Sequence, residues 1–523
     1  MTESVNRRPP SSLKANVAAN LAGNAWIALL QVVCLPIYVH ILGVEAYGLI
    51  GFFAAVQTLV RVLDFGLGHT LNREMARYSV QQSDLAAEAR DFLRTFAVIY
   101  GVVGVGIGVV LAALAPVLAS EFITARSLPA TTIAESILLM AIVLALQWPM
   151  SAYIGALLGM QQHWTVNWTK VLFATAANVA SIVLLLSVAA PTIVLFFSVQ
   201  VIVTAAALFV TGACAWRAMP AMASYQAARF RMTLLRRHWR FAAGVTGLTI
   251  TGLVMTQADK WILLKLVDLE SFGYYTLAAT VAASLYFLVT PLFNAFFPRF
   301  SALTAVGEQD ELARQYHITT QLMACLLFPL GLVLMLFAPE ILLVWTHNSH
   351  VAEHAATVVA LLALGNVING VMHLPYALQL AAGWTSLGLR INVALLTVFV
   401  PLVYYCIWRY GLAGAGIAWA TAGFLYLVSG VPLTHHRLLK HEQARWWLKD
   451  ILVPLTLSVA VLVVARLLVT LDHSWLIFLV ELLLFTVLAV ALSVISCGQL
   501  RAWCLAQLQQ RFDSKTTERA PIR

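Results

Sequence analysis

Residues 95–118 read TFAVIYGVVGVGIGVVLAALAPVL, a run of 24 residues without a charged side chain. About 20 consecutive apolar residues are enough for an α-helix to cross the hydrocarbon core of a bilayer. Arg94 precedes the run and Glu121 follows it closely, so charged residues bound it on both sides. The stretch therefore predicts a transmembrane helix.

The rest of the chain has the same character. Of its 523 residues, 61% are hydrophobic and 11% are charged, and the mean hydropathy is +0.85. A soluble globular protein carries about 25% charged residues. The composition therefore excludes a soluble enzyme and a disordered chain. The six cysteines contain no Cys-x-x-Cys spacing, so the sequence predicts neither a disulfide framework nor a metal site.

Hydropathy and turn signals predict an all-α integral membrane protein with fourteen transmembrane helices. The expected spans are 16–39, 46–68, 92–118, 134–159, 168–189, 192–216, 241–264, 272–296, 316–338, 355–382, 387–408, 411–434, 450–470 and 474–497. The loops between them leave no room for a nucleotide-binding or an external catalytic domain, and the Gly-rich phosphate loop of ATP-driven proteins is missing. We therefore expect a protein that is not an enzyme and that has no cofactor.

The basic residues predict the orientation of these spans. The net charge is +9, from 32 Lys+Arg against 23 Asp+Glu. Cytoplasmic loops of membrane proteins are enriched in Lys and Arg. If the N-terminus is cytoplasmic, the external segments hold only Arg126, Lys265 and Arg409, and the large majority of basic residues lie on the cytoplasmic side. The even number of spans then places both termini in the cytoplasm, and the charge requires no nucleic-acid partner.

A weak internal repeat divides the chain. Glu45-Ala46-Tyr47-Gly48 recurs 225 residues later as Glu270-Ser271-Phe272-Gly273, and the same offset relates the starts of the first and seventh spans. A repeat of six spans, an even number, is a parallel repeat. We expect two parallel-repeat six-helix bundles around a central cleft, plus two C-terminal helices. The expected segments are a cytoplasmic tail 1–15, an N-terminal bundle 16–216, a basic cytoplasmic linker 217–240, a C-terminal bundle 241–434, two additional helices 450–497 and a cytoplasmic tail 498–523.

Polar residues inside the spans are the candidates for a substrate cleft, because an ionisable group near the centre of a span costs about 2.5–3.5 kcal/mol. Arg61 and Asp64 share one face of the second span. Asp259 and Lys260 lie in the seventh span. The uncharged candidates are Asn20, Asn24, Gln57, Gln257, Asn369 and His373. Together these residues predict a hydrated lumen that accommodates a polar cargo.

Each candidate also has a structural interpretation, and the sequence leaves both open. Arg61 and Asp64 can form a self-neutralised pair that is buried for packing. Lys260 can extend to the external interface and leave only its alkyl chain in the bilayer. The amide side chains can form hydrogen bonds between helices. His373 can titrate near neutral pH or serve as a hydrogen-bonded structural residue.

Several segments resemble a known family. The first four are Leu35-Pro36-Ile37-Tyr38, Leu42-Gly43-Val44-Glu45-Ala46-Tyr47-Gly48, Leu63-Asp64-Phe65-Gly66-Leu67-Gly68 and Arg73-Glu74-Met75-Ala76-Arg77. They are similar to the start of the bacterial polysaccharide (O-antigen-type) flippases of the multidrug/oligosaccharidyl-lipid/polysaccharide exporter superfamily. Residues 259–262 and 272–275 are similar to the second-half signature of the same family.

The resemblance implies translocation of an undecaprenyl-pyrophosphate-linked oligosaccharide across the bacterial inner membrane by alternating access. The cargo would be an O-antigen, capsule or exopolysaccharide repeat unit that moves from the cytoplasmic to the periplasmic leaflet. Arg61 and Lys260 would contact its diphosphate through charge-assisted hydrogen bonds. The implied partners are the lipid bilayer, a polysaccharide polymerase and chain-length proteins. Coupling to H⁺ or Na⁺ through Asp64 or Asp259, or to the membrane potential, stays open.

Three other functions compete with this one. A cation-coupled drug or small-solute exporter belongs to the same superfamily. A peptidoglycan-precursor lipid flippase is a second alternative, although relatives of that kind carry several arginines in the central cavity and the first span here has none. A membrane-bound polymerase or ligase is a third, and it is expected to show a large basic external loop. The longest external loops here, 119–133 and 339–354, carry only Arg126.

Overall fold

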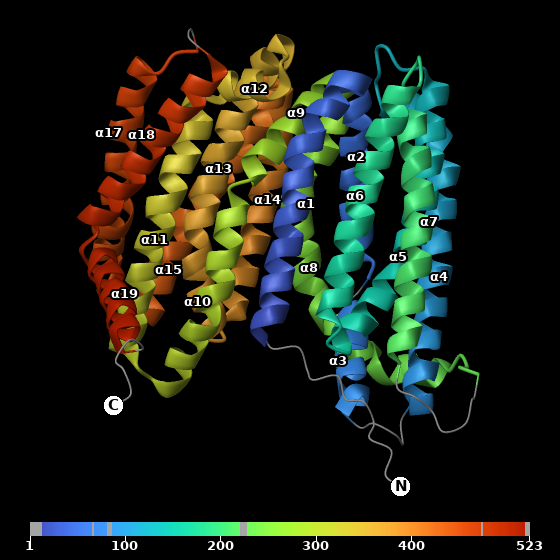
Figure 1. Cartoon of the computed structure of the whole chain (residues 1–523), viewed down its shortest axis with the longest axis horizontal. Helices are drawn as coiled ribbons and strands as arrows, with labels where there is room; N and C mark the ends of the chain where they lie inside the picture. The colour runs from blue at the N-terminus through green and yellow to red at the C-terminus, as the bar shows by residue number, and fades with distance from the viewer. Residues whose placement is uncertain (1–12, 65–66, 81–85, 220–226, 472–473, 518–523) are drawn as a thin grey trace. The chain divides into compact units, whose positions relative to one another are not determined.

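The structure, a computed structural model, describes residues 13–64, 67–80, 86–219, 227–471 and 474–517, and these segments fold as helices without a strand (Figure 1). Their contacts divide the chain into two compact units, Met1–Gly273 and Tyr274–Arg523. Eleven helices in the described part are long and apolar enough to cross a membrane, or twelve if the bent pair α9–α10 counts as one span. The expectation of an all-α membrane protein is confirmed.

The first unit holds the N-terminal helices. Their bounds are α1 (Leu13–Leu42), α2 (Val44–Val62), α3 (Leu67–Val80), α4 (Ala86–Val117), the π-helical turn η1 (Leu118–Phe122), α5 (Ala130–Gly159), α6 (His163–Ser187), α7 (Ile193–Ala218), α8 (Met232–Leu266) and the start of α9 (Leu269–Ala283). Helix α5 lies against α4, α7 and α3, while α1 runs beside α6, as Figure 1 shows. Helix α8 packs on α2, α3 and α4.

The second unit holds the remaining helices. Their bounds are α10 (Tyr286–Val306), α11 (Gln309–Leu336), α12 (Ala338–Thr346), α13 (Ser349–Ala381), α14 (Thr385–Tyr410), α15 (Leu412–Leu438), α16 (Gln443–Arg445), the π-helical turn η2 (Trp446–Leu452), α17 (Val453–Leu468), α18 (Trp475–Ser496) and α19 (Gly498–Thr517). Helix α13 packs on α15, α11, α10 and α12. The two additional helices expected at 450–497 correspond to α17 and α18, which pack on each other and on α11.

The helix packing repeats between the units in the order that the internal repeat predicts. In the first unit α4 packs on α5, α5 on α7, and α6 on α7. In the second unit α11 packs on α13, α13 on α15, and α14 on α15. Each set also contains an interrupted span, since α2 is followed by α3 and α9 is bent by 40° from α10. Equivalent helices therefore make equivalent neighbours.

Three boundaries differ from the expected ones. The second span was expected to reach residue 68, but α2 ends at Val62 and α3 begins a new helix at Leu67. The thirteenth span was expected to begin at 450, but the apolar helix begins at Gln443 and includes the turn η2. Helix α8 starts at Met232, inside the expected linker 217–240. The division of the chain at 217–240 stays a prediction based on the repeat.

Apolar clusters hold α17 and α18 in the second unit. Phe337, at the end of α11, is fully buried against Leu462 of α17 and Phe478 of α18. A second cluster joins Cys325 of α11 to Cys497 and Leu500 at the junction of α18 and α19. Burying a side chain of this size stabilises the fold by about 1.5–3 kcal/mol. The two helices are thus part of the packed unit, although they lie outside the sequence repeat.

Candidate functional site

The two copies of the repeated motif meet at the turns that begin α2 and α9. A Cβ atom on Gly48 would lie 2.5 Å from the carbonyl oxygen of Leu269, and one on Gly273 would lie 2.3 Å from that of Val44. Both distances are far below van der Waals contact, so each site requires glycine. The same 225-residue offset relates Val44 to Leu269 and Gly48 to Gly273. The motif residues therefore form a close crossing of two helix starts.

Charged residues around the crossing tie a third segment to it. The carboxylate of Glu45 accepts hydrogen bonds from the backbone N–H groups of Arg126 and Ser127, and from the Ser127 hydroxyl. The Arg126 guanidinium lies 2.6 Å from Asp268 Oδ2. Asp268 Oδ1 in turn accepts from the N–H of Ser271 at 2.8 Å, which caps the start of α9. These residues therefore have a structural role, because they hold the segment at 126–127 against the starts of α2 and α9.

Arg61 and Lys170 are two basic side chains of the first unit that lie on different helices. Arg61 lies in the last turn of α2, and Lys170 lies seven residues into α6. Both side chains are exposed, and neither makes a hydrogen bond or an ion pair with any residue that the structure describes. Lys170 lies within the electrostatic field of Arg61. Arg61 and Lys170 are thus two like charges without a counter-ion among the described residues.

A cavity of about 280 Å³ extends from Lys170 between α1, α5, α6 and α7. Its polar lining consists of Lys170, Gln200, Thr169, Thr204 and Thr211. Gln200 donates to the Ser181 hydroxyl at 3.3 Å. The remaining lining is apolar, with residues such as Ile27, Ile154 and Phe173. Lys170 therefore lies at the edge of a cavity that is lined by both polar and apolar residues.

Asp64 does not form the self-neutralised pair with Arg61 that the sequence left open. Its Oδ1 accepts the hydroxyl hydrogen of Tyr100 in α4, and its Oδ2 accepts the backbone N–H of Gly68 at 3.1 Å. Its carboxylate therefore caps the start of α3 and ties that start to α4. Arg61 lacks this acidic partner because the chain leaves the α2 helix after Val62, so the i, i+3 spacing no longer brings the two side chains together.

The remaining candidates of the first unit lie on three helices. Gln57 donates to Gln147 of α5 at 2.6 Å, which is an interhelical hydrogen bond. Asn24 is exposed on α1, whereas the side chain of Asn20 lies outside the described residues. In α8, Lys260 Nζ donates to the Oε1 atom of Gln257 at 3.0 Å.

The charged pair of α8 lies beside an aromatic contact. Asp259 and Lys260 are both half-buried. The ring of Trp261 meets those of Phe52 and Phe122 at centroid distances of 6.2 and 6.5 Å. The aromatic contact fixes this end of α8 against α2 and η1, so Lys260 is held at a defined place in the first unit.

In the second unit, Asn369 and His373 lie together with aromatic rings. Tyr286 donates its hydroxyl to Asn369 Oδ1 at 3.1 Å, and His373 Nδ1 lies 2.9 Å from the carbonyl oxygen of Asn369. The His373 ring is 5.7 Å from the ring of Tyr286 and 6.1 Å from that of Phe293. The cluster presents polar atoms beside aromatic faces, a combination that suits a sugar as well as a helix–helix contact.

The sequence prediction did not include two further features. The first is Lys170, which could have been found as a lysine inside the expected span 168–189. The second feature is a buried network, in which His317 of α11 lies between Asp450 and Glu442, with Nε2 at 2.9 Å from Glu442. Gln321 donates to Asp450 Oδ1 at 2.8 Å. His317 and Asp450 are more than 130 residues apart, so no local spacing could have revealed this contact.

The structure resembles solved transporters along most of its length. It matches the lipid II flippase MurJ in an inward closed conformation with a TM-score of 0.69 and 14% identity, covering 92% of this chain and 98% of that chain. It matches an inward-facing multidrug resistance MATE family transporter of the MOP superfamily with a TM-score of 0.61 and 14% identity, covering 80% of this chain and 95% of that one. The fold is that of multi-pass membrane transporters.

Sequence comparison places the chain more narrowly. Residues 13–304, more than half of the chain, match the family described as polysaccharide biosynthesis protein, and residues 248–405 match MatE. A putative O-antigen transporter of Shigella flexneri is 23% identical over 185 residues, which are 35% of this chain and 43% of that relative. The match thus spans less than half of the curated relative. The chain belongs to the polysaccharide biosynthesis protein family, and its fold is that of solved multi-pass membrane transporters.

Proposed function

We propose that this chain is a flippase that moves an undecaprenyl-pyrophosphate-linked oligosaccharide from the cytoplasmic to the periplasmic leaflet by alternating access. Membership of the polysaccharide biosynthesis protein family supports the class of cargo. The structural observation that supports it most directly is the Arg61–Lys170 pair, which has no counter-ion in the described part of the chain. A pyrophosphate group supplies the missing negative charge.

The chemistry of the pair suits a pyrophosphate. Two like charges near each other at the edge of a low-dielectric region repel, and an anion between them converts that repulsion into attraction. A guanidinium offers a planar fork of N–H donors for phosphate oxygens, while an ammonium acts as a compact point charge. Arg61 would therefore orient one phosphate, and Lys170 would hold the other beside the cavity of the first unit.

Other residues predicted from the sequence would contact the cargo later or more weakly in this mechanism. Lys260, with its partner Gln257, lies near the end of α8 and would receive the diphosphate after the first contact at Arg61. Asn369 and His373 would contact sugar groups beside the ring of Tyr286. The polyprenyl tail would stay in lipid along the exposed apolar faces of α17 and α18, at residues such as Leu467 and Leu484.

The distribution of charge supports a location in the bacterial inner membrane with both termini in the cytoplasm. On this orientation Arg61 lies toward the cytoplasmic leaflet, where a lipid-linked glycan is first available. Lys260 lies toward the periplasmic side, where the cargo is released. A polysaccharide polymerase and chain-length proteins are the proposed partners on that side. Asp64 and Asp259 stay candidates for coupling to H⁺ or Na⁺, with the membrane potential as a further source of drive.

A reconstituted flipping assay tests the proposal. The purified protein is placed in proteoliposomes that contain a fluorescent undecaprenyl-pyrophosphate oligosaccharide, and loss of signal to an impermeant quencher reports translocation. We expect Arg61→Ala and Lys170→Ala each to lower the rate at least tenfold, and the double variant to abolish it. Lys449→Ala is the matched control, because Lys449 is an exposed basic residue of the second unit. Undiminished flipping in the double variant contradicts the assigned site, and no flipping by the wild type contradicts the function.

A second function is favoured by one observation. The match of residues 248–405 to MatE links this chain to multidrug exporters, so a cation-coupled export of drugs or small solutes is the competing proposal. Such an exporter would raise drug resistance and show dye efflux that depends on an H⁺ or Na⁺ gradient. A flippase would do neither. Measurements of drug resistance and of ion-dependent dye efflux therefore separate the two functions. A peptidoglycan-precursor flippase would act on lipid II in the flipping assay.

A further inference from the structure

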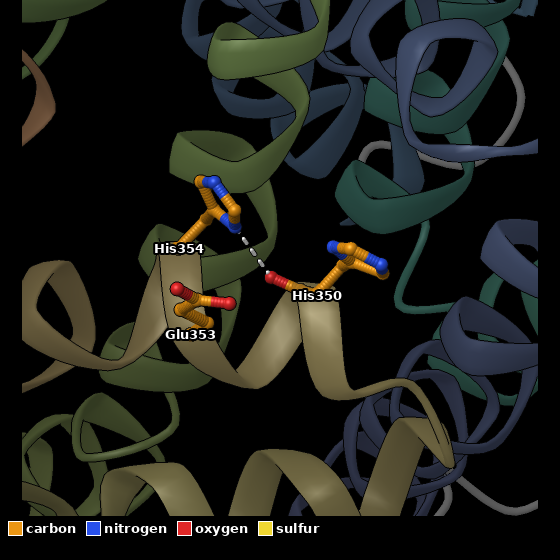
Figure 2. A group of neighbouring side chains, drawn as sticks. All are labelled: His350, Glu353 and His354. Atoms are coloured by element: carbon orange, nitrogen blue, oxygen red, sulfur yellow. Dashed lines mark hydrogen bonds between the residues drawn. The ribbon is translucent and has the colours of Figure 1, made fainter.

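Three potential metal ligands gather at the start of α13, and none of them is a residue assigned to transport. They are His350, Glu353 and His354, all exposed, and Figure 2 shows them on one short stretch of this helix. One donor atom of each lies within 4.8 Å of a donor atom of each of the others. Residues at positions i, i+3 and i+4 share a helix face, so the backbone itself brings the three side chains together.

The hydrogen bonding of His354 defines which nitrogen can coordinate a metal. Its Nδ1 lies 2.8 Å from the carbonyl oxygen of His350, drawn as a dashed line in Figure 2. A carbonyl oxygen only accepts, so Nδ1 carries the hydrogen and Nε2 presents its lone pair. Metal-binding histidines commonly donate the other ring N–H to a backbone carbonyl in this way. His354 thus presents Nε2 as its coordinating atom.

The orientation of the His354 ring is also held from outside the cluster. The ring of Tyr274 stacks on it at a centroid distance of 5.0 Å and an angle of 15°. The His350 ring lies 6.4 Å from the His354 ring. A positioned imidazole loses less conformational freedom on binding than a mobile one. The positive end of the helix dipole opposes a cation here, and the carboxylate of Glu353 supplies the compensating negative charge.

We propose that His350, Glu353 and His354 bind a divalent transition-metal ion, and that Zn²⁺ is the ion that fits this ligand set. Two imidazoles and one carboxylate form a ligand set that Zn²⁺ accepts, and three protein ligands leave a position for water. Two histidines four residues apart on a helix have the spacing of established helical zinc sites. With bonds of about 2.0–2.1 Å, the donor atoms must approach to about 3.3 Å of one another. Rotation of the exposed side chains supplies this closure.

Metal titration of the full-length protein in detergent tests the proposal. The chain contains 13 histidines, so the affinity tag must contain none. Zn²⁺ is titrated in competition with a chromophoric chelator, and we expect one saturable ion per chain. His350→Ala and His354→Ala are each expected to weaken binding at least tenfold, which corresponds to about 1.4 kcal/mol. Glu353→Gln is expected to weaken it less, because both imidazoles remain. His40→Ala, which removes an exposed histidine of α1, is the control and should leave binding unchanged.

Two measurements keep the test decisive. Thermal unfolding of the metal-free variants shows whether they fold like the wild type. X-ray absorption of the Zn²⁺-loaded wild type reports the ligands without any substitution, and two imidazoles with a carboxylate are expected. A saturable site that survives His350→Ala/His354→Ala, or absorption data with sulfur or fewer than two imidazoles, overturns the assignment. Wild-type protein without a saturable site overturns it as well. None of these outcomes depends on whether the chain flips a glycolipid.

Discussion

Gly48 packs against the backbone of Leu269 so closely that a methyl group on it would lie 2.5 Å from the carbonyl oxygen. The equivalent residue of the other repeat, Gly273, packs in the same way against Val44. The two contacts are related by the 225-residue offset of the sequence repeat. A local turn signature in each repeat therefore becomes one pseudo-symmetric contact in the folded chain, with helix starts crossing where only hydrogen atoms fit.

Replacing either glycine is expected to destabilise the protein. Gly48→Ala and Gly273→Ala each force the crossing helices apart, and overpacking of this kind costs about 1–3 kcal/mol. The double variant should cost less than the sum of the two, because the first separation relieves the second contact. Thermal unfolding in detergent measures the change. Gly106→Ala serves as control, since nothing lies within 4 Å of its added methyl group and alanine favours a helix.

The negative charge of the Glu45 carboxylate is expected to stabilise the protein. Glu45→Gln keeps the size of the side chain but replaces one acceptor oxygen with a donor group, which cannot accept from the N–H groups of Arg126 and Ser127. Hydrogen bonds to a charged group contribute about 1.5–3 kcal/mol each. We expect a lower unfolding temperature and faster proteolysis at 123–129. Glu135→Gln, an exposed glutamate of α5, should change neither, and equal effects in both variants would contradict this role.

The buried His317–Asp450 contact is expected to be the most sensitive polar contact of the second unit. Both side chains are fully buried, so removing one partner leaves the other without its main interaction at a cost of about 3–5 kcal/mol. His317→Ala and Asp450→Ala should each lower the unfolding temperature, and the double variant should be less damaged than the sum. Lys449→Ala alters the neighbouring exposed residue and is the control. Additive effects would show that the two groups do not act together.

Unlike His317 and Asp450, the Arg61–Lys170 pair should be important for activity and not for stability. The two positive charges repel in the free protein, so Lys170→Met relieves repulsion while it keeps the apolar length of the side chain. We expect the unfolding temperature to stay equal or rise, while flipping falls at least tenfold. Sites kept for function commonly trade stability in this way. A clear loss of stability in Lys170→Met would indicate a structural role instead.

The membrane fold follows largely from local patterns. Long apolar runs such as 95–118 and the turns near Gly43 and Gly411 are readable from neighbouring residues, because a helix in lipid must satisfy its own backbone hydrogen bonds. The interruption after Val62 was not foreseen. There the Asp64 carboxylate caps a new helix and accepts a hydrogen bond from Tyr100, a residue 36 positions away. Span ends depend on such distant contacts.

The candidate site was foreseen only in part. Arg61 stood out as a charged residue in an apolar run, but the acidic partner offered by spacing, Asp64, is occupied by other groups. The charge of Arg61 acts instead on Lys170, which belongs to another helix. The sequence likewise singled out His373 and not His317, although His317 is the residue that lies between two carboxylates. Spacing along one helix predicts shared faces and says nothing about which face meets another helix.

The sequence alone determined that this chain is a multi-pass helical membrane protein with an internal repeat, because hydropathy and charge distribution act through the bilayer on each segment separately. The tertiary structure decided the pairing of charges. It separated Arg61 from Asp64, placed Lys170 within the field of Arg61, and buried His317 with Asp450. These contacts depend on which helix faces meet, and that choice is made by packing between distant segments, as at Gly48 and Leu269.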